Sequence, residues 1–206
     1  MKTKFKHILV ILCLSMISCE GNLEPELFDQ ITPENFLTNE DDVKTAVTGV
    51  YAEFRGISEW GRYKTSWGSV MTLQEVPTDL WAANWFYKAH TDFMWKATDY
   101  FVCEIFEFFV PAITKATALI ARIQDAPVSD DIKNRYIAEL RVVRALWMYD
   151  LFDLYGPVPA ITDPEKILNP TQDFTVTRPS REEYITFVET ELKEVINAKI
   201  LPVAWT

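Results

Sequence analysis

The residues best suited to ligand chemistry are aromatic and gather between positions 60 and 95. This stretch holds five tryptophans, with tyrosine and phenylalanine between them. Within it, the run 81–87 (Trp-Ala-Ala-Asn-Trp-Phe-Tyr) sets flat rings beside an amide, and a carboxylate shortly precedes it. Flat rings stack on the C–H faces of sugars, while amides and carboxylates bond their hydroxyls. The predicted carbohydrate-binding residues are Asp79, Trp81, Asn84, Trp85 and Tyr87.

A structural interpretation of the same aromatics stays open. Each tryptophan taken singly could equally belong to a core beneath a long loop, or to an interface with another protein. A long stretch without periodicity is usually functional or disordered, and this density of aromatic residues argues against disorder. The cluster as a whole therefore favours binding.

Catalytic arrangements are poorly represented. The two histidines are His7, near the N-terminus, and His90, which we expect to be a surface or hydrogen-bonded loop residue. No Gly-x-Ser-x-Gly nucleophile motif is present. Glu75 and Asp79 are the one carboxylate pair worth testing for glycoside hydrolysis, and ligand contact is the favoured role for them. The sequence predicts a binding protein and not an enzyme.

Cofactors, metals and nucleic acid are not expected as partners. No His/Cys cluster has zinc spacing, no Gly-rich phosphate loop exists, and no EF-hand spacing supports calcium. Calcium bound by loop carboxylates remains an open alternative. The formal net charge of −10 argues against binding to nucleic acid.

The N-terminus has the pattern of an export signal. Residues 1–6 carry three lysines, an apolar segment follows to Ile17, and Ser18-Cys19 resembles a bacterial lipobox. We expect a signal peptide at 1–18, lipidation of Cys19, and a lipidated tether over 19–31 that anchors the chain to a membrane. The alternative is an ordinary secretory signal with a chance cysteine.

Apolar periodicity predicts four long helices. We expect them near 38–56, 100–125, 129–155 and 180–200, with Pro111 kinking or splitting the second. Loops are expected over 57–98 and 163–179. Predicted N-terminal caps are Thr38 with Asp41, Ser129, and Ser180 with Glu183, and Gly156 is expected to end the third helix.

The third helix should organise the fold. Its apolar residues recur at helical spacing and are expected to face a core: Leu140, Val143, Leu146, Trp147, Leu151 and Leu154. Asp150 and Asp153 should face away from this stripe. Arg141 and Arg144 share a face; they could bind an anion, but structural ion pairs or contacts to carbonyl groups are the favoured interpretation. In the last helix, Ile196 is expected inside.

The predicted fold class is all-α. Paired amphipathic helices that each bury one face indicate a tetratricopeptide-like, right-handed stack of paired helices with long inserted loops. No strict short repeat is present.

The third helix and its end also carry a family resemblance. Glu139, Arg144, Ala145, Tyr149, Leu151, Tyr155, Gly156, Val158 and Pro159 match a Glu-rich aromatic helix running into Tyr-Gly-x-Val-Pro. This run resembles the SusD/RagB family of outer-membrane nutrient-binding lipoproteins, and residues 29–36 resemble the mature N-terminus of such proteins. Family members are longer, so residues 32–206 are interpreted as an incomplete N-terminal helical domain.

The resemblance implies the same helical scaffold and a role in nutrient capture. SusD-like glycan binders carry Trp-x-x-Asn in a binding loop, which points to Trp81 and Asn84 here. The chain would then bind an oligosaccharide derived from starch or another polysaccharide, and deliver it to a TonB-dependent, SusC-like transporter. It would be lipid-anchored at the outer membrane and exposed at the cell surface. The alternatives are a RagB-type peptide or nutrient binder, or a transporter-docking fragment without a ligand.

Overall fold

The computed structural model describes residues 36–54, 70–81, 87–168 and 175–202. The chain divides into two compact units, Met1–Phe36 and Leu37–Thr206, and every helix described below lies in the second. The helices are α2 (Glu40–Ala52), α3 (Val70–Glu75), α4 (Lys88–Thr91), α5 (Tyr100–Asp125), α6 (Asp130–Tyr155), α7 (Pro164–Leu168) and α8 (Arg181–Ala198). Those ranges contain no β-strand, and none of their helices is both long and apolar enough to cross a membrane.

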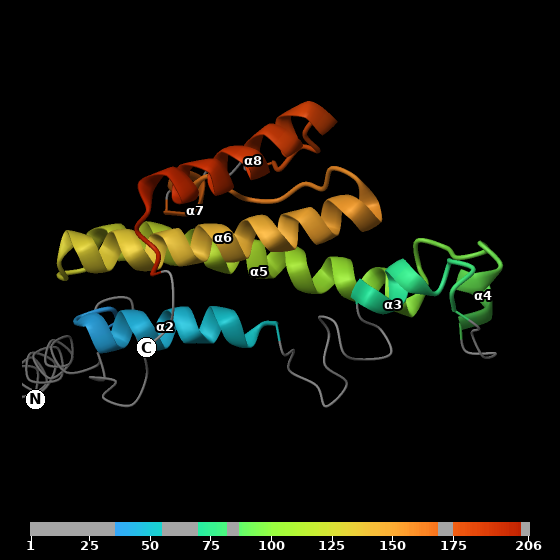
Figure 1. Ribbon diagram of the computed structural model, residues 1–206, viewed down its shortest axis with the longest axis horizontal. Coiled ribbons are helices and arrows are strands. Elements are labelled where there is room, and N and C mark those ends of the chain that lie inside the picture. The colour runs from blue at the N-terminus through green and yellow to red at the C-terminus, as the bar shows by residue number, and fades with distance from the viewer. Residues whose placement is uncertain (1–35, 55–69, 82–86, 169–174, 203–206) are drawn as a thin grey trace, which may run out of the picture. The chain divides into compact units, whose positions relative to one another are not determined.

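The long helices α5 and α6 form an antiparallel hairpin at the centre of the second unit (Figure 1). α8 packs on α6, whereas α2 contacts both α5 and α6. Of the short helices, α7 contacts α5, and α3 contacts both members of the hairpin. Helix α6 therefore has neighbours on several sides, as expected for the helix that organises the fold.

Both ends of α6 follow from the sequence. Ser129 is the N-cap, and its Oγ accepts a hydrogen bond from the Ile132 N–H at 3.5 Å. Asp130 and Asp131 occupy the first turn, where the helix dipole favours negative charge. Gly156 ends the helix with φ +71°, a backbone angle that residues with a Cβ rarely adopt. Both predicted ends are confirmed.

The core stripe of α6 is mostly as predicted. Leu140, Val143, Trp147 and Leu151 are buried, but Leu146 is exposed. The expectation that Asp150 faces away from the core is wrong, because Asp150 is 2% exposed. A helix covered on several sides buries polar positions that a single-stripe pattern assigns to solvent.

The start of α2 differs from the predicted cap by one residue. Asn39, and not Thr38, is the N-cap, and its side chain accepts a hydrogen bond from the Asp42 N–H at 3.0 Å. The carboxylate of Asp42 accepts bonds from the Thr38 N–H at 2.8 Å and the Thr38 hydroxyl at 2.6 Å. Asp42 therefore takes the role expected of Asp41. The helix ends at Ala52, before the predicted stop at position 56.

Pro111 does not split α5, which is one helix from Tyr100 to Asp125. Proline removes the N–H that would bond the carbonyl four residues earlier, that of Glu107. Both Glu107 and Pro111 are exposed, so water can reach the carbonyl that lacks its helical partner. A proline on the solvent side is thus compatible with an unbroken helix.

The capping box of α8 is confirmed in full. Ser180 Oγ accepts from the Glu183 N–H at 3.2 Å, and the Glu183 carboxylate accepts from the Ser180 N–H at 2.7 Å. Tyr184 and Val195 are buried, but Ile196, predicted to lie inside, is 70% exposed. Short helices were not predicted: α3 and α4 lie in the expected loop 57–98, and α7 lies in the expected loop 163–179. They are too short for apolar periodicity to reveal.

Candidate functional site

The predicted binding residues fall partly outside the described ranges. Cys19, Asn84 and Trp85 lie outside them, as do the proposed signal and tether. Asp79, Trp81 and Tyr87 are described, and they flank α3 and α4. The aromatic stretch can therefore be followed from Val70 to Trp81 and from Tyr87 onward.

Tyr87 has a packing role. It is 7% exposed and belongs to a cluster with Val76 and Phe101, against which Leu73 packs. Its ring centroid lies 5.4 Å from that of Phe101. Burial also raises the pKa of its hydroxyl. The interpretation that places some of these aromatics in a core therefore describes Tyr87 well.

Trp81 and Asp79 lie in the turn after α3 and are exposed. The Thr78 N–H and hydroxyl both donate to the Glu75 carbonyl, at 3.0 Å and 2.6 Å, which ends the helix and fixes the turn. Trp81 is 38% exposed, and Asp79 is also exposed. A ring and a carboxylate that are both open to solvent could contact a ligand.

Two exposed aromatic side chains follow α4, at a helix end of unusual composition. The Phe93 N–H bonds to the His90 carbonyl at 3.2 Å, and the Met94 N–H bonds to the Ala89 carbonyl at 2.7 Å. These two bonds define a Schellman motif, in which the residue with positive φ is usually glycine. Here Phe93 occupies that position, with φ +56°. Phe93 is 66% exposed and Trp95 is 43% exposed, with their centroids 5.5 Å apart.

His90 lies behind Trp95. The two rings are stacked, with centroids 6.1 Å apart and an interplanar angle of 18°, and Phe101 meets the imidazole edge-on at 6.0 Å. His90 is 5% exposed, and neither ring nitrogen has a hydrogen-bond partner within the described part of the chain. The expectation of a surface or hydrogen-bonded loop histidine is therefore wrong. Burial lowers the pKa of His90, an effect opposed by nearby Asp99.

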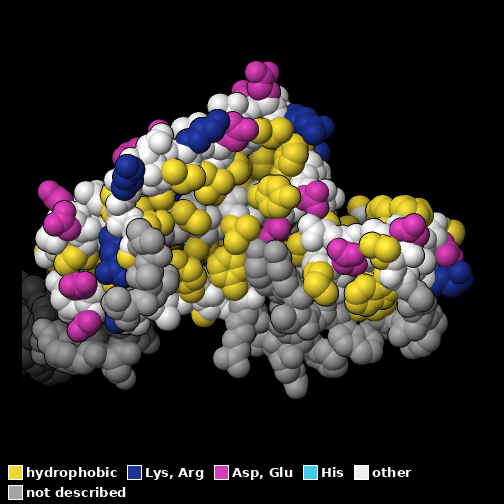
Figure 2. Space-filling view, in the orientation of Figure 1, with side chains coloured by type: hydrophobic (Ala, Val, Ile, Leu, Met, Phe, Trp, Pro, Cys, Tyr) yellow, Lys and Arg dark blue, Asp and Glu magenta, His cyan; other side chains and the backbone are white. Residues whose placement is uncertain are grey.

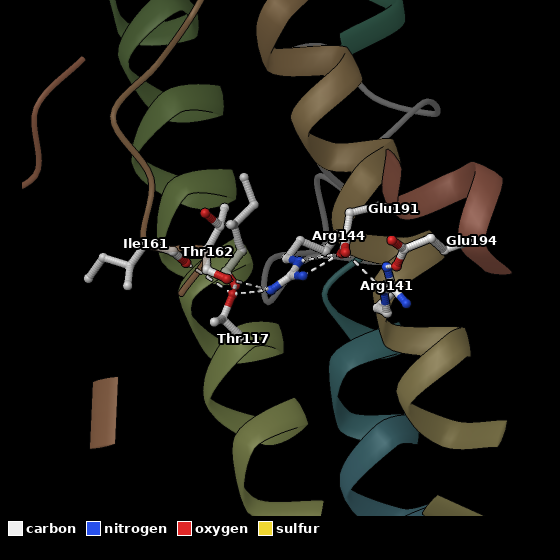
Figure 3. A network of polar contacts seen from close by, with 8 residues as sticks. Thr117, Arg141, Arg144, Ile161, Thr162, Glu191 and Glu194 are labelled. Carbon is white, nitrogen blue, oxygen red and sulfur yellow. Dashed lines mark hydrogen bonds and ion pairs between the residues drawn. The ribbon is translucent and has the colours of Figure 1, made fainter. Parts of the chain in front are cut away.

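The arginines of α6 are held in a polar network (Figure 3). Arg141 donates to Glu191 at 2.8 Å and to Glu194 at 2.5 Å, and Arg144 also forms an ion pair with Glu191. Arg144 further donates to the Thr117 hydroxyl at 2.8 Å and to the Thr162 carbonyl at 3.1 Å. The predicted structural ion pairs are confirmed, with their acids on α8. The network joins α5, α6, α8 and the segment after α6.

A cavity of about 270 Å³ lies beside this network. Its apolar lining includes Met148, Val158, Tyr184 and Phe187, and Lys166 adds a charge. Tyr184 already uses its hydroxyl to donate to the Met148 carbonyl at 2.9 Å. None of the predicted binding residues in the described ranges lines this cavity. Those ranges also contain no group of three acidic, histidine or cysteine side chains placed to hold a metal ion.

Sequence reasoning missed the arrangement of Phe93, Trp95 and His90. The tryptophan and phenylalanine were visible as members of the aromatic stretch, but the short helix that presents them was not. The sequence feature that marks this helix end is Asp92-Phe93-Met94, in which phenylalanine stands at the position that glycine usually occupies.

Comparison with known proteins gives a consistent result. No protein-family model matches the chain. SusD-like protein P38 from Formosa agariphila is 25% identical over 203 residues, which cover 93% of this chain and 37% of that protein. The chain thus spans little more than a third of the length of this curated relative.

Solved structures show the same fold. A SusD-like protein from Bacteroides fragilis matches with a TM-score of 0.63 and 22% identity, over 84% of this chain and 32% of its own. Surface glycan-binding protein A from Bacteroides uniformis gives 0.66 and 14%, over 81% and 36%. A laminarin-binding SusD-like protein gives 0.57 and 22%, over 78% and 34%. The predicted all-α, tetratricopeptide-like stack of paired helices is confirmed.

Proposed function

We propose that this chain, which is similar to SusD-like proteins in sequence and fold, binds an oligosaccharide and delivers it to a TonB-dependent, SusC-like outer-membrane transporter. Two structural neighbours support a carbohydrate ligand: one is described as glycan-binding and another as laminarin-binding. The proposed task is capture and transfer, without chemical change to the ligand.

The observation that carries the proposal is the exposed aromatic surface around α3 and α4. Trp81 follows α3 with its ring partly open to solvent, and Asp79 lies two residues before it. A large aromatic ring that stays open to solvent leaves apolar surface that a ligand can cover, and hydrophobic side chains show at the surface over α3 and α4 in Figure 2. A sugar ring supplies an apolar face to the ring and hydroxyls to the carboxylate. Asn84 and Trp85 are assigned to this proposed site from their positions in the sequence.

The proposed location is the outer face of the outer membrane. A lipid anchor on Cys19 would hold the chain there, since each buried methylene contributes about 0.8 kcal/mol and several acyl chains together give stable attachment. Residues 19–31 would serve as the tether. Anchoring would keep the binding surface close to the transporter, which limits loss of ligand by diffusion.

Affinity electrophoresis tests the proposal directly. The purified chain is run through gels that contain laminarin, xyloglucan or starch, beside Trp81→Ala. Retardation by one polysaccharide, weakened in Trp81→Ala, is the expected result. Ile196→Ala serves as the control, because Ile196 is a large apolar side chain that is 70% exposed on α8, a helix that packs on α6.

Several results would contradict the proposal. No retardation by any polysaccharide, from a chain that circular dichroism shows to be helical, would overturn glycan binding by this chain. Binding of short peptides in place of sugars would favour the RagB-type alternative. Co-purification with a transporter in the absence of any ligand would favour a docking fragment, and hydrolysis of a bound glycan would overturn the non-enzymatic role.

A further inference from the structure

We propose that Phe93 and Trp95 form a second carbohydrate-stacking surface, which we call the Phe93–Trp95 shelf, and that His90 positions it. The ligand class is a pyranose ring of the same glycan, so this inference rests on the proposed function. It adds a site that includes none of the five residues predicted from the sequence, which are Asp79, Trp81, Asn84, Trp85 and Tyr87.

The backbone at Phe93 gives the first argument. A bulky residue with φ +56° lies in the left-handed region, which disfavours side chains that carry a Cβ. The two hydrogen bonds of the helix end would form equally well with glycine or asparagine at this position. Conformation therefore does not account for a phenylalanine here.

Burial does not account for it either. The Phe93 ring is 66% exposed, so it contributes little to the core beneath it. A residue that is both strained and exposed is a candidate for a functional role, because strain of this kind gathers at ligand-binding positions. The left-handed conformation turns the chain sharply and brings the ring to 5.5 Å from that of Trp95.

The Trp95 half of the shelf is supported from behind before any ligand arrives. Trp95 stacks on the buried imidazole of His90, and Phe101 supports that imidazole from its edge. Phe101 in turn belongs to the cluster with Val76 and Tyr87. A ring fixed in this way loses little conformational freedom when a ligand stacks on it, which favours binding. His90 acts through Trp95 and is a positioning residue.

The size of the shelf favours a sugar over a protein partner. A stable protein interface buries about 800 Å² on each side. Two aromatic rings, each able to bury about 150–250 Å² in full and already partly covered here, fall well short of that area. They match the flat face of one or two sugar rings. Exposed Lys96 and Asp92 in the same turn could bond sugar hydroxyls.

The test separates binding from folding. Phe93→Gly and Phe93→Asn remove the ring but suit the left-handed conformation, so the melting temperature should be equal or higher. Binding of malto-oligosaccharides, laminari-oligosaccharides and xylogluco-oligosaccharides is measured by isothermal titration calorimetry. With the ligand that binds the unaltered chain, we expect affinity about tenfold weaker in both variants and in Trp95→Ala. Met94→Ala, in the same turn and 70% exposed, should bind normally.

His90 is tested by rescue. His90→Ala should weaken the same binding by removing the support behind Trp95, whereas His90→Phe should restore it with a flat ring of similar size. If the unaltered chain binds a glycan and the Phe93 and Trp95 variants bind it equally well, the shelf is overturned while the proposed function stands. If the unaltered chain binds none of these sugars, the proposed function is overturned, and the shelf with it.

Discussion

Arg144 on α6 and Glu191 on α8 form an ion pair in which both side chains are buried, 5% and 8% exposed. The same carboxylate accepts from Arg141, and the guanidinium of Arg144 also reaches α5 and the segment after α6. Glu191 thus pairs with both arginines at the point where α8 meets the hairpin, and Glu194 adds a second carboxylate beside Arg141.

Glu191→Gln should destabilise the protein strongly. Removing one partner of a buried pair leaves an uncompensated charge, at a cost of about 3–5 kcal/mol in the free energy of unfolding. Urea denaturation monitored by circular dichroism measures this loss. Glu194→Gln is the matched control, because Glu194 bonds the same Arg141 but is 60% exposed, and its loss should cost less than about 1 kcal/mol. Equal effects would contradict the role of burial.

The buried histidine predicts a pH dependence of stability. Burial lowers the folded-state pKa of His90 below its ordinary 6.5, with Asp99 opposing. Between those two pKa values the unfolded chain binds more protons than the folded one, so the free energy of unfolding falls as the pH drops from about 6.5. Above that range the contribution is fully present. Asp99 is the charge that opposes this shift, and the Lys88–Asp92 ion pair around α4 is exposed.

His90→Phe should remove this part of the pH dependence. Urea midpoints at pH 7.5 and pH 5.5 are compared for the variant and the unaltered chain, so that contributions from other groups cancel. The unaltered chain is expected to lose more stability on acidification than the variant does. An identical loss in both would show that His90 titrates alike in the folded and unfolded states.

Ser180→Ala should shorten or loosen the start of α8. It removes the hydroxyl that accepts from the Glu183 N–H, a change that typically costs about 1 kcal/mol. Hydrogen exchange should show faster exchange at the first turn of α8, while the middle of α6 stays protected. Ser180→Asp supplies another capping oxygen and should retain most of the stability. Equal loss in both variants would argue against a capping role.

Trp147 allows the packing of the core to be tested. Its side chain is fully buried between Phe54, at 5.0 Å, and Phe109, at 6.1 Å. Trp147→Ala should cost about 3–5 kcal/mol through the cavity it leaves. Trp147→Phe should cost much less, partly because the indole N–H has no hydrogen-bond partner within the described ranges. Thermal unfolding compares the two, and similar losses would show that the indole makes packing contacts that a phenyl ring cannot replace.

Local signals in the sequence predicted the helix ends well. Ser129, Gly156 and the Ser180–Glu183 box act through hydrogen bonds or backbone angles within a few residues, so neighbouring sequence is sufficient to identify them. Thr38 and Asn39 show the limit of this reasoning, because two adjacent capping residues compete and the geometry selects between them.

Interactions between distant elements were harder to predict. Leu146 and Asp150 were assigned to the wrong sides of α6, since one apolar stripe cannot describe a helix with neighbours on several faces. The acids that pair with Arg141 and Arg144 lie about 50 residues away, beyond any local pattern. At the candidate site, aromatic composition pointed to the right stretch, but the stacking of His90 on Trp95 depends on a turn that the sequence did not reveal.

Helix α5 also separates the turn after α4 from the arginine network. Its 26 residues span about 39 Å, with Phe101 near one end and Thr117 about 24 Å further along. At that distance substitutions usually have additive effects on stability. The turn after α4 lies beyond the first end, against Phe101, and the arginine network lies around Thr117. Under the proposed function, mutation in the turn after α4 would therefore change which sugar is preferred without weakening the helical stack, so ligand preference and scaffold stability would be free to evolve independently.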